Sequence, residues 1–433
     1  MLKRLLLSFT ALYTVFSMGF SQSIILSGEF RPRTEYAHGF KTLASKDQNS
    51  GFFTTQRSRI NLSYSGLKSK SYISVQDVRT WGNQVQLVEN EDRAISIHEA
   101  WFMPQLDKKG LWALKIGRQE LVYDDHRIFG NVAWAQAARS HDAVLLKYMP
   151  NDKSKLDIAL AYNQDFARLN SNLYTTANYK TMQMLWYHSS ITKFNYSLLF
   201  VNLGFQVSGK DSLNKDIQDT KFNQTLGTHF DYSHNKFTLT GNIFYQLGKQ
   251  ASLVEKDISA YLLGLEAQYS VLSNHKLSLG YELQSGNSQK EASDKNKAFN
   301  PYYGTNHKFN GTMDYFYVGN HINSVGLQDI YAKWNAKLKK FNLGADLHLF
   351  SAAADILNPA NADVASKNLG TELDIYLDFS FSENVKCLIG YSQMLATESM
   401  QYLKGGKYDE TQNWAFIMLT YNPVFFKHET IKN

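Results

Sequence analysis

The sequence predicts an all-β protein: a single transmembrane antiparallel up-and-down β-barrel of about 18 strands. Three observations lead to this fold class: an unusual composition, an alternation of apolar and polar residues, and an alternation of short and long links. A barrel wall accounts for all three, because its strands turn apolar side chains to lipid and polar ones to the lumen. Short turns then lie on one rim and long loops on the other.

The composition combines 14% aromatic residues with a polar average, a mean hydropathy of −0.37. Disorder and a disulfide scaffold are excluded, since aromatic residues are abundant, only 6 of 433 residues are proline and there is one cysteine. After residue 21, no stretch approaches the roughly 18 consecutive apolar residues that a membrane-spanning helix needs. A large soluble domain or a membrane β-barrel remains, and the aromatic girdles of a barrel favour the second.

The N-terminus has the pattern of a secretory signal peptide. Lys3 and Arg4 precede an apolar run, and small residues precede a cleavage site before Gln22. We therefore expect residues 1–21 to be removed and residues 22–433 to form one barrel domain. The formal net charge of +6 is too small to indicate nucleic acid as a partner.

Period-two alternation recurs along the mature chain. Between Leu369 and Phe381, the odd positions are mostly large and apolar, whereas the even positions include Glu372, Asp374 and Asp378. A helix would scatter these residues around its circumference, but a strand places the carboxylates on one face and the apolar groups on the other. The same pattern recurs at residues 237–247 and 341–349.

Short links and long polar segments alternate in the order that an outer-membrane barrel requires. We predict short periplasmic turns at about 65–69, 105–110, 150–153, 189–191, 233–235, 271–274, 338–339 and 381–383. We predict long external loops at about 37–51, 80–92, 122–140, 164–179, 204–221, 248–256, 286–326, 353–367 and 396–411. The even number of strands returns both termini to the periplasmic side.

Arginine is confined to the first part of the chain. All 11 arginines lie at or before residue 168, and the last 265 residues use lysine as their cation. Arginine provides a planar, permanently charged and forked donor that lysine does not imitate. The first third of the chain therefore requires this chemistry.

Alternation places several arginines in the lumen. Arg57 and Arg59 share the polar face of one strand, and Arg31 and Arg33 share a face of its neighbour. Arginine on the lipid face would cost about 2–4 kcal/mol at the midplane. Arg118 has the parity of apolar neighbours, so it lies either near the interface or at a bulge. The candidate anion-binding residues of the pore are Arg31, Arg33, Arg57, Arg59, Arg79, Arg118, Arg127 and Arg139, and the candidate counter-charges are Asp77, Glu99, Glu120, Asp124, Asp125 and Asp142.

A column of arginines in a pore would concentrate anions and offer them successive weak binding sites. The alternative is a lattice of arginines and carboxylates that stiffens the wall, and the two interpretations can coexist.

The segment from Lys115 to Asp142 carries a motif in several parts. Its residues are Gly117 to Leu121, Tyr123 to Asp125, Arg127, Phe129, Gly130, Trp134 and Arg139 to Ala143, with His141 as the variable position. In these residues the segment resembles the alginate export family of outer-membrane proteins. Further matching stretches are His307 to Phe316, Leu369 to Asp374 and Trp414 to Tyr421. The resemblance implies a monomeric barrel of eighteen strands with an electropositive, arginine-lined conduit for a polyuronate or a similar acidic glycan. The chain departs from a common barrel ending, because it continues to Asn433, and Phe425 or Phe426 could replace the terminal aromatic residue in assembly.

We therefore expect a passive, anion-selective, porin-like channel in the outer membrane of a Gram-negative-type bacterium. The expected partners are outer-membrane lipid, an anionic glycan or small anionic solute, and the barrel-assembly machinery. The alternatives are an outer-membrane enzyme and a non-conducting barrel that binds glycans or acts as an adhesin. Single-channel conductance separates the channel from both.

No catalytic residue, metal ion or cofactor is predicted. Ser140, His141 and Asp142 are consecutive, so on a strand they point to opposite faces and do not form a hydrolytic relay. Asp124 and Asp125, with nearby histidines, could bind a cation, but a neighbouring arginine more often neutralises such a loop pair.

The long external loop 286–326 combines a polar first half with aromatic residues in its second half. Such a loop could fold over or into the pore mouth as a lid or constriction, or its aromatic rings could stack on sugar faces. A mobile external loop is the alternative.

Overall fold

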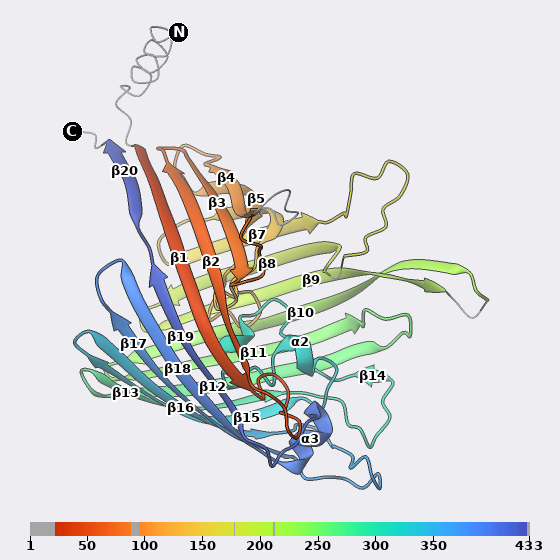
Figure 1. The fold of residues 1–433 in the computed structure, drawn as a ribbon. Helices are drawn as coiled ribbons and strands as arrows, with labels where there is room; N and C mark the ends of the chain where they lie inside the picture. The colour runs from red at the N-terminus through yellow and green to blue at the C-terminus, as the bar shows by residue number, and fades with distance from the viewer. Residues whose placement is uncertain (1–21, 88–94, 177, 211–212, 431–433) are drawn as a thin grey trace.

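The computed structural model describes residues 22–87, 95–176, 178–210 and 213–430. These residues form a closed antiparallel barrel of 18 wall strands, with short turns on one rim and long loops on the other (Figure 1). The predicted fold class is therefore confirmed. The expected signal peptide, residues 1–21, lies outside the described residues, as do residues 431–433.

The wall strands follow one another around the barrel in chain order. The first nine are β1 (Gln22–His38), β2 (Gly51–Ser65), β3 (Ser69–Thr80), β4 (Ser96–Pro104), β5 (Trp112–Gln119), β6 (His141–Tyr148), β7 (Ser154–Tyr162), β8 (Thr181–Ile191) and β9 (Phe194–Lys210). The next nine are β10 (Asp216–His234), β11 (Phe237–Lys249), β12 (Asp257–Leu272), β13 (His275–Gln284), β15 (Leu327–Leu338), β16 (Phe341–Ser351), β17 (Asn368–Ser380), β18 (Val385–Ala396) and β19 (Gln412–Tyr421).

The barrel closes where β19 pairs with β1, from Phe30 opposite Tyr421 to His38 opposite Asn413. The strand β20 (Val424–Thr430) continues this pairing along the first residues of β1, so it extends the last wall strand rather than adding another. The two-residue β14 (Lys295–Asn296) pairs with the start of β12 from within a loop. Both ends of the described chain therefore lie on the short-turn rim (Figure 1).

The predicted alternation is confirmed in β17. The carboxylate side chains of Glu372 and Asp374 are buried inside the barrel, whereas Leu373 and Ile375 are 39% and 47% exposed on the outside. The outer face is apolar on most strands, as a wall in contact with lipid requires.

Three of the described elements are short helices in the long loops. They are η1 (Asn306–Lys308), α2 (Val318–His321) and α3 (Glu398–Lys404). Among the described residues, no helix has the length and the apolar character that a membrane crossing needs.

One predicted loop is wrong. The segment 204–221 was expected to be a long external loop, but β9 and β10 remain paired as far as Lys210 opposite Asp216. The hairpin projects beyond the rim of the barrel (Figure 1). The sequence did not reveal this extension because polar residues fit a solvated hairpin as well as they fit a loop.

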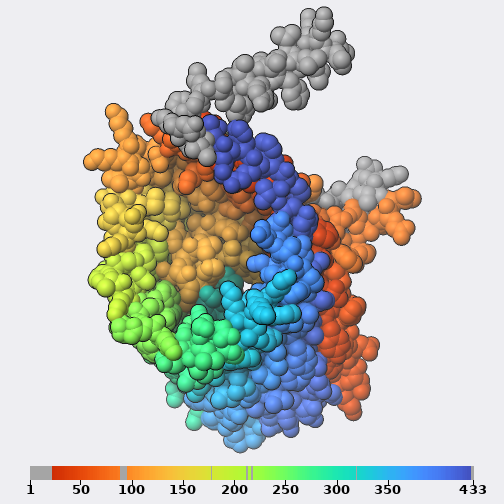
Figure 2. Space-filling view, turned by 90° about the vertical axis from the view of Figure 1, so that its left-hand side faces the viewer, coloured from red at the N-terminus to blue at the C-terminus, as the bar shows by residue number. Residues whose placement is uncertain are grey.

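Two segments of the long loops fold into the barrel. Residues 120–140 pack against β6 to β9, β11 and β12 through Leu121, Tyr123, Ile128 and Phe129, which all lie in one buried cluster. The second segment comprises residues 298–316. Its Met313, Tyr315 and Phe316 pack into a second buried cluster with β16 to β19. Figure 2 looks into the barrel and shows atoms in the colour of residues near 130 inside the ring of strands. We name these residues the first inserted segment (120–140) and the second inserted segment (298–316).

Candidate pore constriction

Four arginines on β1 and β2 face the lumen. Arg31 lies opposite Arg57 in the strand pairing, and Arg59 and Arg33 lie opposite Glu29 and Thr55. Arg31, Arg33 and Arg57 are at most 7% exposed. The structure thus brings together the four arginines that alternation assigned to the pore.

Three of these arginines hold the first inserted segment. Arg31 Nη1 donates to the carbonyl of Ala133 at 2.8 Å, and Arg33 Nη1 donates to that of Trp134 at 2.8 Å. Arg57 Nη1 reaches the carbonyl of Gln136 at 3.3 Å. A chain folded inside a barrel lacks strand partners for its carbonyls, and the forked guanidinium groups supply the missing donors.

Carboxylates neutralise only part of this charge. Arg33 pairs with Glu35 at 2.8 Å and Arg57 pairs with Glu29 at 2.5 Å. In the described part of the chain, no carboxylate lies within ion-pair distance of Arg31 or Arg59. The Nη2 atom of Arg59 has no hydrogen-bond partner among the described residues. The column therefore keeps an excess of positive charge beside the inserted segment.

Trp134 joins the two inserted segments to the wall. The guanidinium of Arg33 lies 4.2 Å from the centre of the Trp134 ring, and His307 stacks on its other side at 4.4 Å. Trp414 and Phe416 of β19 contact the same ring edge to face. Such contacts stabilise the aromatic ring beyond simple burial of its area.

Arg127 and Arg139 lie on the first inserted segment itself and not on the wall. Arg127 pairs with Glu282 of β13, and it lies 4.5 Å from the ring of Phe309. Arg139 donates to the carbonyl of Gly304 at 3.2 Å. Arg127 therefore connects the first inserted segment to the wall strand β13, and Arg139 connects it to the second inserted segment.

The second inserted segment binds to wall carboxylates. The amide of Met313 donates to Glu372 at 2.8 Å, and the amide and hydroxyl of Thr312 donate to Asp374. Asn310 donates to Glu282 at 2.9 Å and to Asp329 at 3.2 Å. These residues were not predicted as site residues. The inward parity of Glu372 and Asp374 was visible in the sequence, but not the loop that they bind.

Four predicted pore residues lie on the outer face of the barrel, which corrects the prediction. Arg118 pairs with Asp142 at 2.9 Å, and both side chains are exposed beside the outward Ile116 and Val144. The reason is parity, because Gly117 and Gln119 take the inward positions of β5.

Arg79 and Asp77 are the other two corrected residues. They pair with each other at 2.6 Å near the long-loop rim. Their strand partners in β2, Gln56 and Ser58, have the same parity as the exposed Ile60. An ion pair near the rim remains within reach of water, which explains why arginine is tolerated on the outer face there.

The remaining counter-charges lie in the lumen around two cavities. Glu99 and Glu120 line a cavity of about 480 Å³, together with Tyr72, Trp101 and Lys115. Asp124 and Asp125 line a cavity of about 260 Å³, together with Lys155, Trp186, His188, His229 and Asp231. Both cavities lie in the half of the barrel nearer the short turns, since they include residues close to those turns.

Ser140, His141 and Asp142 bond to three different partners. Ser140 contacts His98, His141 Nδ1 lies 2.9 Å from the Tyr179 hydroxyl, and Asp142 pairs with Arg118 on the outside. These three side chains do not form a relay.

Known structures share this fold at low sequence identity. The barrel superimposes on OccAB4 of Acinetobacter baumannii with a TM-score of 0.59 and 13% identity, covering 93% of this chain and 98% of that one. It superimposes on OpdO of Pseudomonas aeruginosa with a TM-score of 0.58 and 11% identity, covering 93% and 98%. For OpdK of the same organism, with vanillate, the TM-score is 0.57 at 10% identity, covering 92% and 99%.

No curated protein matches this sequence. The family model described as Alginate export matches residues 23–416, almost the whole described barrel. The chain therefore belongs to the Alginate export family and is a β-barrel protein of the outer membrane of a Gram-negative-type bacterium.

Proposed function

We propose that this protein is a passive outer-membrane channel for anionic solutes, with an acidic oligo- or polysaccharide such as a polyuronate as its cargo. The observation that carries the proposal is the charge of the column on β1 and β2, where four arginines have two carboxylate partners. Within low-dielectric walls, such an excess of charge focuses the field and attracts anions.

The lumen beside the column offers further cationic positions. Lys115 borders the larger cavity and lies 4.1 Å from the centre of the Trp101 ring, and no carboxylate among the described residues lies within ion-pair distance of it. Lys155 borders the smaller cavity beside Trp186. An ammonium group beside an aromatic face suits a uronate, whose carboxylate and apolar ring face lie side by side.

The space-filling view supports a narrow passage. Figure 2 shows an opening beside the first inserted segment, toward the strands coloured blue. Arg31, Arg33 and Arg57 are bonded to carbonyls of the first inserted segment. Arg59 is less buried than the other three arginines and has no carboxylate partner among the described residues, so it is the arginine that we assign to direct anion contact.

Planar-bilayer recording tests the proposal. The wild-type channel should conduct and prefer anions, and a polyuronate oligomer should reduce its chloride current more than a neutral oligosaccharide of equal length. Arg59→Gln should shift the reversal potential toward lower anion preference. Arg118→Gln is the matched control, because it removes the same charge from the outer face.

Two outcomes would contradict the proposal. A wild-type barrel without conductance would favour a non-conducting glycan-binding barrel or an enzyme. Equal selectivity in the wild type and the Arg59→Gln variant would remove Arg59 from the anion path. Assembly as a monomer by the barrel-assembly machinery is a separate part of the proposal, and it rests on the closed barrel with its apolar outer face.

A further inference from the structure

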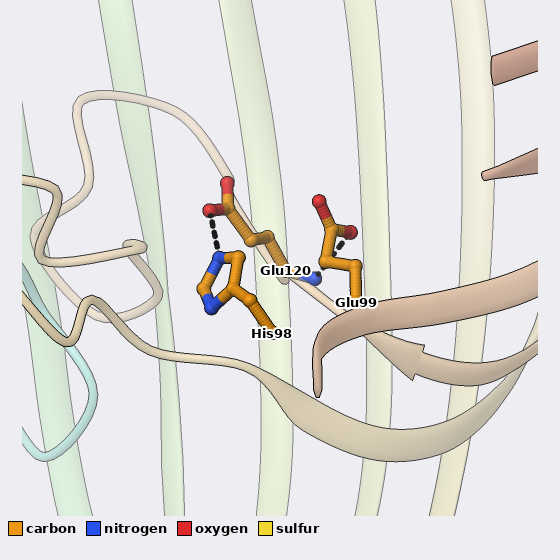
Figure 3. Close-up of side chains that lie close together, drawn as sticks. All are labelled: His98, Glu99 and Glu120. Atoms are coloured by element: carbon orange, nitrogen blue, oxygen red, sulfur yellow. Dashed lines mark hydrogen bonds and ion pairs between the residues drawn. The ribbon is translucent and has the colours of Figure 1, made fainter. Parts of the chain in front are cut away.

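Three metal-binding side chains converge at the root of the first inserted segment. His98 and Glu99 come from β4, and Glu120 is the first residue after β5 (Figure 3). One donor atom of each lies within 4.8 Å of the others, and no other histidine, cysteine and carboxylate group of three in the described ranges meets this condition. The imidazole of His98 is 3% exposed, so it is fixed inside the wall.

A β-bulge creates this convergence. Ser74 of β3 pairs with Glu99, but the next residue, Val75, pairs with Ile97, so His98 has no partner in the ladder. Consecutive residues of a regular strand point to opposite faces, whereas a bulge turns both to one side. Regular alternation does not hold at this bulge. His98 was therefore not recognised as a possible ligand from the sequence, which predicted no metal site.

The hydrogen bonds of Ser140 define the proton on His98. The Ser140 hydroxyl donates its single hydrogen to the backbone carbonyl of His98 at 2.5 Å. It is therefore an acceptor toward the Nδ1 atom of His98, 3.1 Å away, and that nitrogen carries the proton. The lone pair of Nε2 then faces a carboxylate oxygen of Glu120 at 2.8 Å. Two lone pairs at this distance repel each other unless a positive group, either a second proton or a metal ion, lies between them.

Neighbouring groups orient the two carboxylates as they do around known metal ions. Asn131 donates to the second oxygen of Glu120 at 2.8 Å, and the Trp101 indole donates to Glu99 at 3.0 Å. Such outer hydrogen bonds fix ligands in place. Both carboxylates also border the 480 Å³ cavity, from which water can complete the coordination.

We propose that His98, Glu99 and Glu120 bind one divalent metal ion of the zinc type. One imidazole and two carboxylates suit Zn²⁺ better than Mg²⁺ or Ca²⁺, which prefer oxygen ligands alone. Ligand atoms of a tetrahedral zinc site lie about 3.3 Å apart for bonds of about 2 Å, so small side-chain rotations convert the observed spacing into a site. The ion ties the wall strand β4 to the root of the first inserted segment. This inference does not depend on the proposed function.

Calorimetry on the untagged full-length protein tests this site. After chelation and dialysis, the barrel in detergent is titrated with Zn²⁺ alone. We expect one ion per chain, and at least a tenfold loss of affinity in His98→Gln, Glu99→Gln and Glu120→Gln. Co²⁺ should give visible absorption of a tetrahedral or five-coordinate site in the wild type, and this absorption should disappear in His98→Gln.

His307→Gln is the matched control, because His307 forms a pair with Asp314 at the same 2.8 Å spacing but belongs to no group of three. Its zinc affinity should equal that of the wild type. Heat-modifiable migration in gels confirms that each variant is a folded barrel. The proposal is overturned by absence of stoichiometric binding in the wild type, by unchanged binding in His98→Gln, or by equal loss in His307→Gln. Unchanged or absent binding would identify His98 and Glu120 as a proton-mediated ion pair.

Discussion

The two inserted segments are held inside the barrel by opposite chemistry. The first segment presents carbonyls, and Arg31, Arg33 and Arg57 of the wall donate to them. The second presents amides and a hydroxyl, and Glu372 and Asp374 of the wall accept from them. In each region the wall strands therefore provide the hydrogen-bonding groups that the inserted segment needs. These groups are donors on β1 and β2 and acceptors on β17.

This comparison explains why arginine is confined to the first part of the sequence. Strands β1 and β2 face a segment whose carbonyls need planar donors that reach several acceptors at once. Strands β13 to β17 need acceptors, and carboxylates provide them there. Of the two interpretations of the arginines, the contacts to Glu29 and Glu35 fit the stiffened wall, and the excess charge fits the proposed anion path.

The largest expected effect is that of Arg57→Ala. The change leaves the Glu29 carboxylate and the Gln136 carbonyl of the first segment without their donor, whereas the carbonyls of Ala133 and Ala135 keep Arg31. Removing one partner of a buried ion pair lowers the free energy of unfolding by about 3–5 kcal/mol. Because Arg31 remains near Glu29, we expect a loss toward the lower end of this range. Urea unfolding should show the loss, and single-channel conductance should rise as the segment loosens. Arg79→Ala on the outer face is the control. An equal loss of stability in this variant would contradict the role of Arg57 in holding the first inserted segment.

A smaller effect is expected for Thr312→Val, which tests the other side of the comparison. The variant keeps the shape of the side chain but removes the hydroxyl that donates to Asp374. A hydrogen bond to a charged group contributes about 1.5–3 kcal/mol. Hydrogen exchange should accelerate at residues 310–316 while residues 131–137 keep their protection. Parallel loss in both segments would mean that they unfold as one unit.

Gly304→Ala tests the contact between the segments. A Cβ atom at Gly304 would overlap the carbonyl oxygen of Arg127, so the two segments must separate. Overpacking of this kind costs about 1–3 kcal/mol. We expect loss of the Arg139 bond to residue 304 and faster proteolysis in both segments. Gly51→Ala is the control, because its Cβ would meet no atom closer than 3.7 Å, an ordinary contact distance. If Gly304→Ala and Gly51→Ala are cleaved at the same rate, the close approach has no effect on stability.

The last expected effect is a pH dependence that is confined to the external loops. Lys404 of α3 donates to the Asn320 carbonyl at 2.9 Å and lies 3.2 Å from His321 Nδ1 and 5.5 Å from the Phe316 ring. Burial lowers the pKa of Lys404 from 10.5 to about 7, and burial with the nearby Lys404 lowers the pKa of His321 to about 3. Within the described ranges, no carboxylate forms an ion pair with Lys404.

Because the folded pKa of Lys404 is below its unfolded value, the folded state binds fewer protons between about pH 7 and 10.5. The equilibrium constant for packing of α3 against the neighbouring loop should therefore rise with pH in this window, by less than about tenfold per pH unit. Hydrogen exchange of residues 398–404, corrected for intrinsic rates, measures it. The Lys404→Met variant should lose the dependence, and a dependence that persists would assign it to another group.

Much of the fold follows from local pattern. Alternation at 369–381 correctly placed Glu372 and Asp374 inside and Leu373 and Ile375 outside. Turn chemistry located most of the short links, because these links need only a few residues of suitable conformation. The extended hairpin of β9 and β10 was missed, since its pairing depends on contacts between residues and not on composition.

The candidate site was predictable only where alternation holds. It placed Arg31, Arg33, Arg57 and Arg59 in the lumen, and it gave Arg118 the parity of its apolar neighbours, on the outer face where this residue lies. Arg79, another candidate pore residue, also lies outside. The sequence pattern also missed His98, which a bulge turns inward. Alternation within one strand does not reveal which face its first residue takes, or where a β-bulge inserts an extra residue.

The sequence by itself determined a barrel with a polar interior, an arginine-rich first third and membership of one family, because period-two alternation and local motifs are properties of neighbouring residues. The tertiary structure alone decided which arginines contact a carbonyl, a carboxylate or lipid. The carbonyl partners lie about 100 residues away along the chain, as Ala133 does from Arg31, so local pattern does not reveal them. The tertiary structure also decided that two long loops enter the lumen. Buried carbonyls and amides need partners wherever the chain brings them, and only the closed barrel fixes which wall strand provides them.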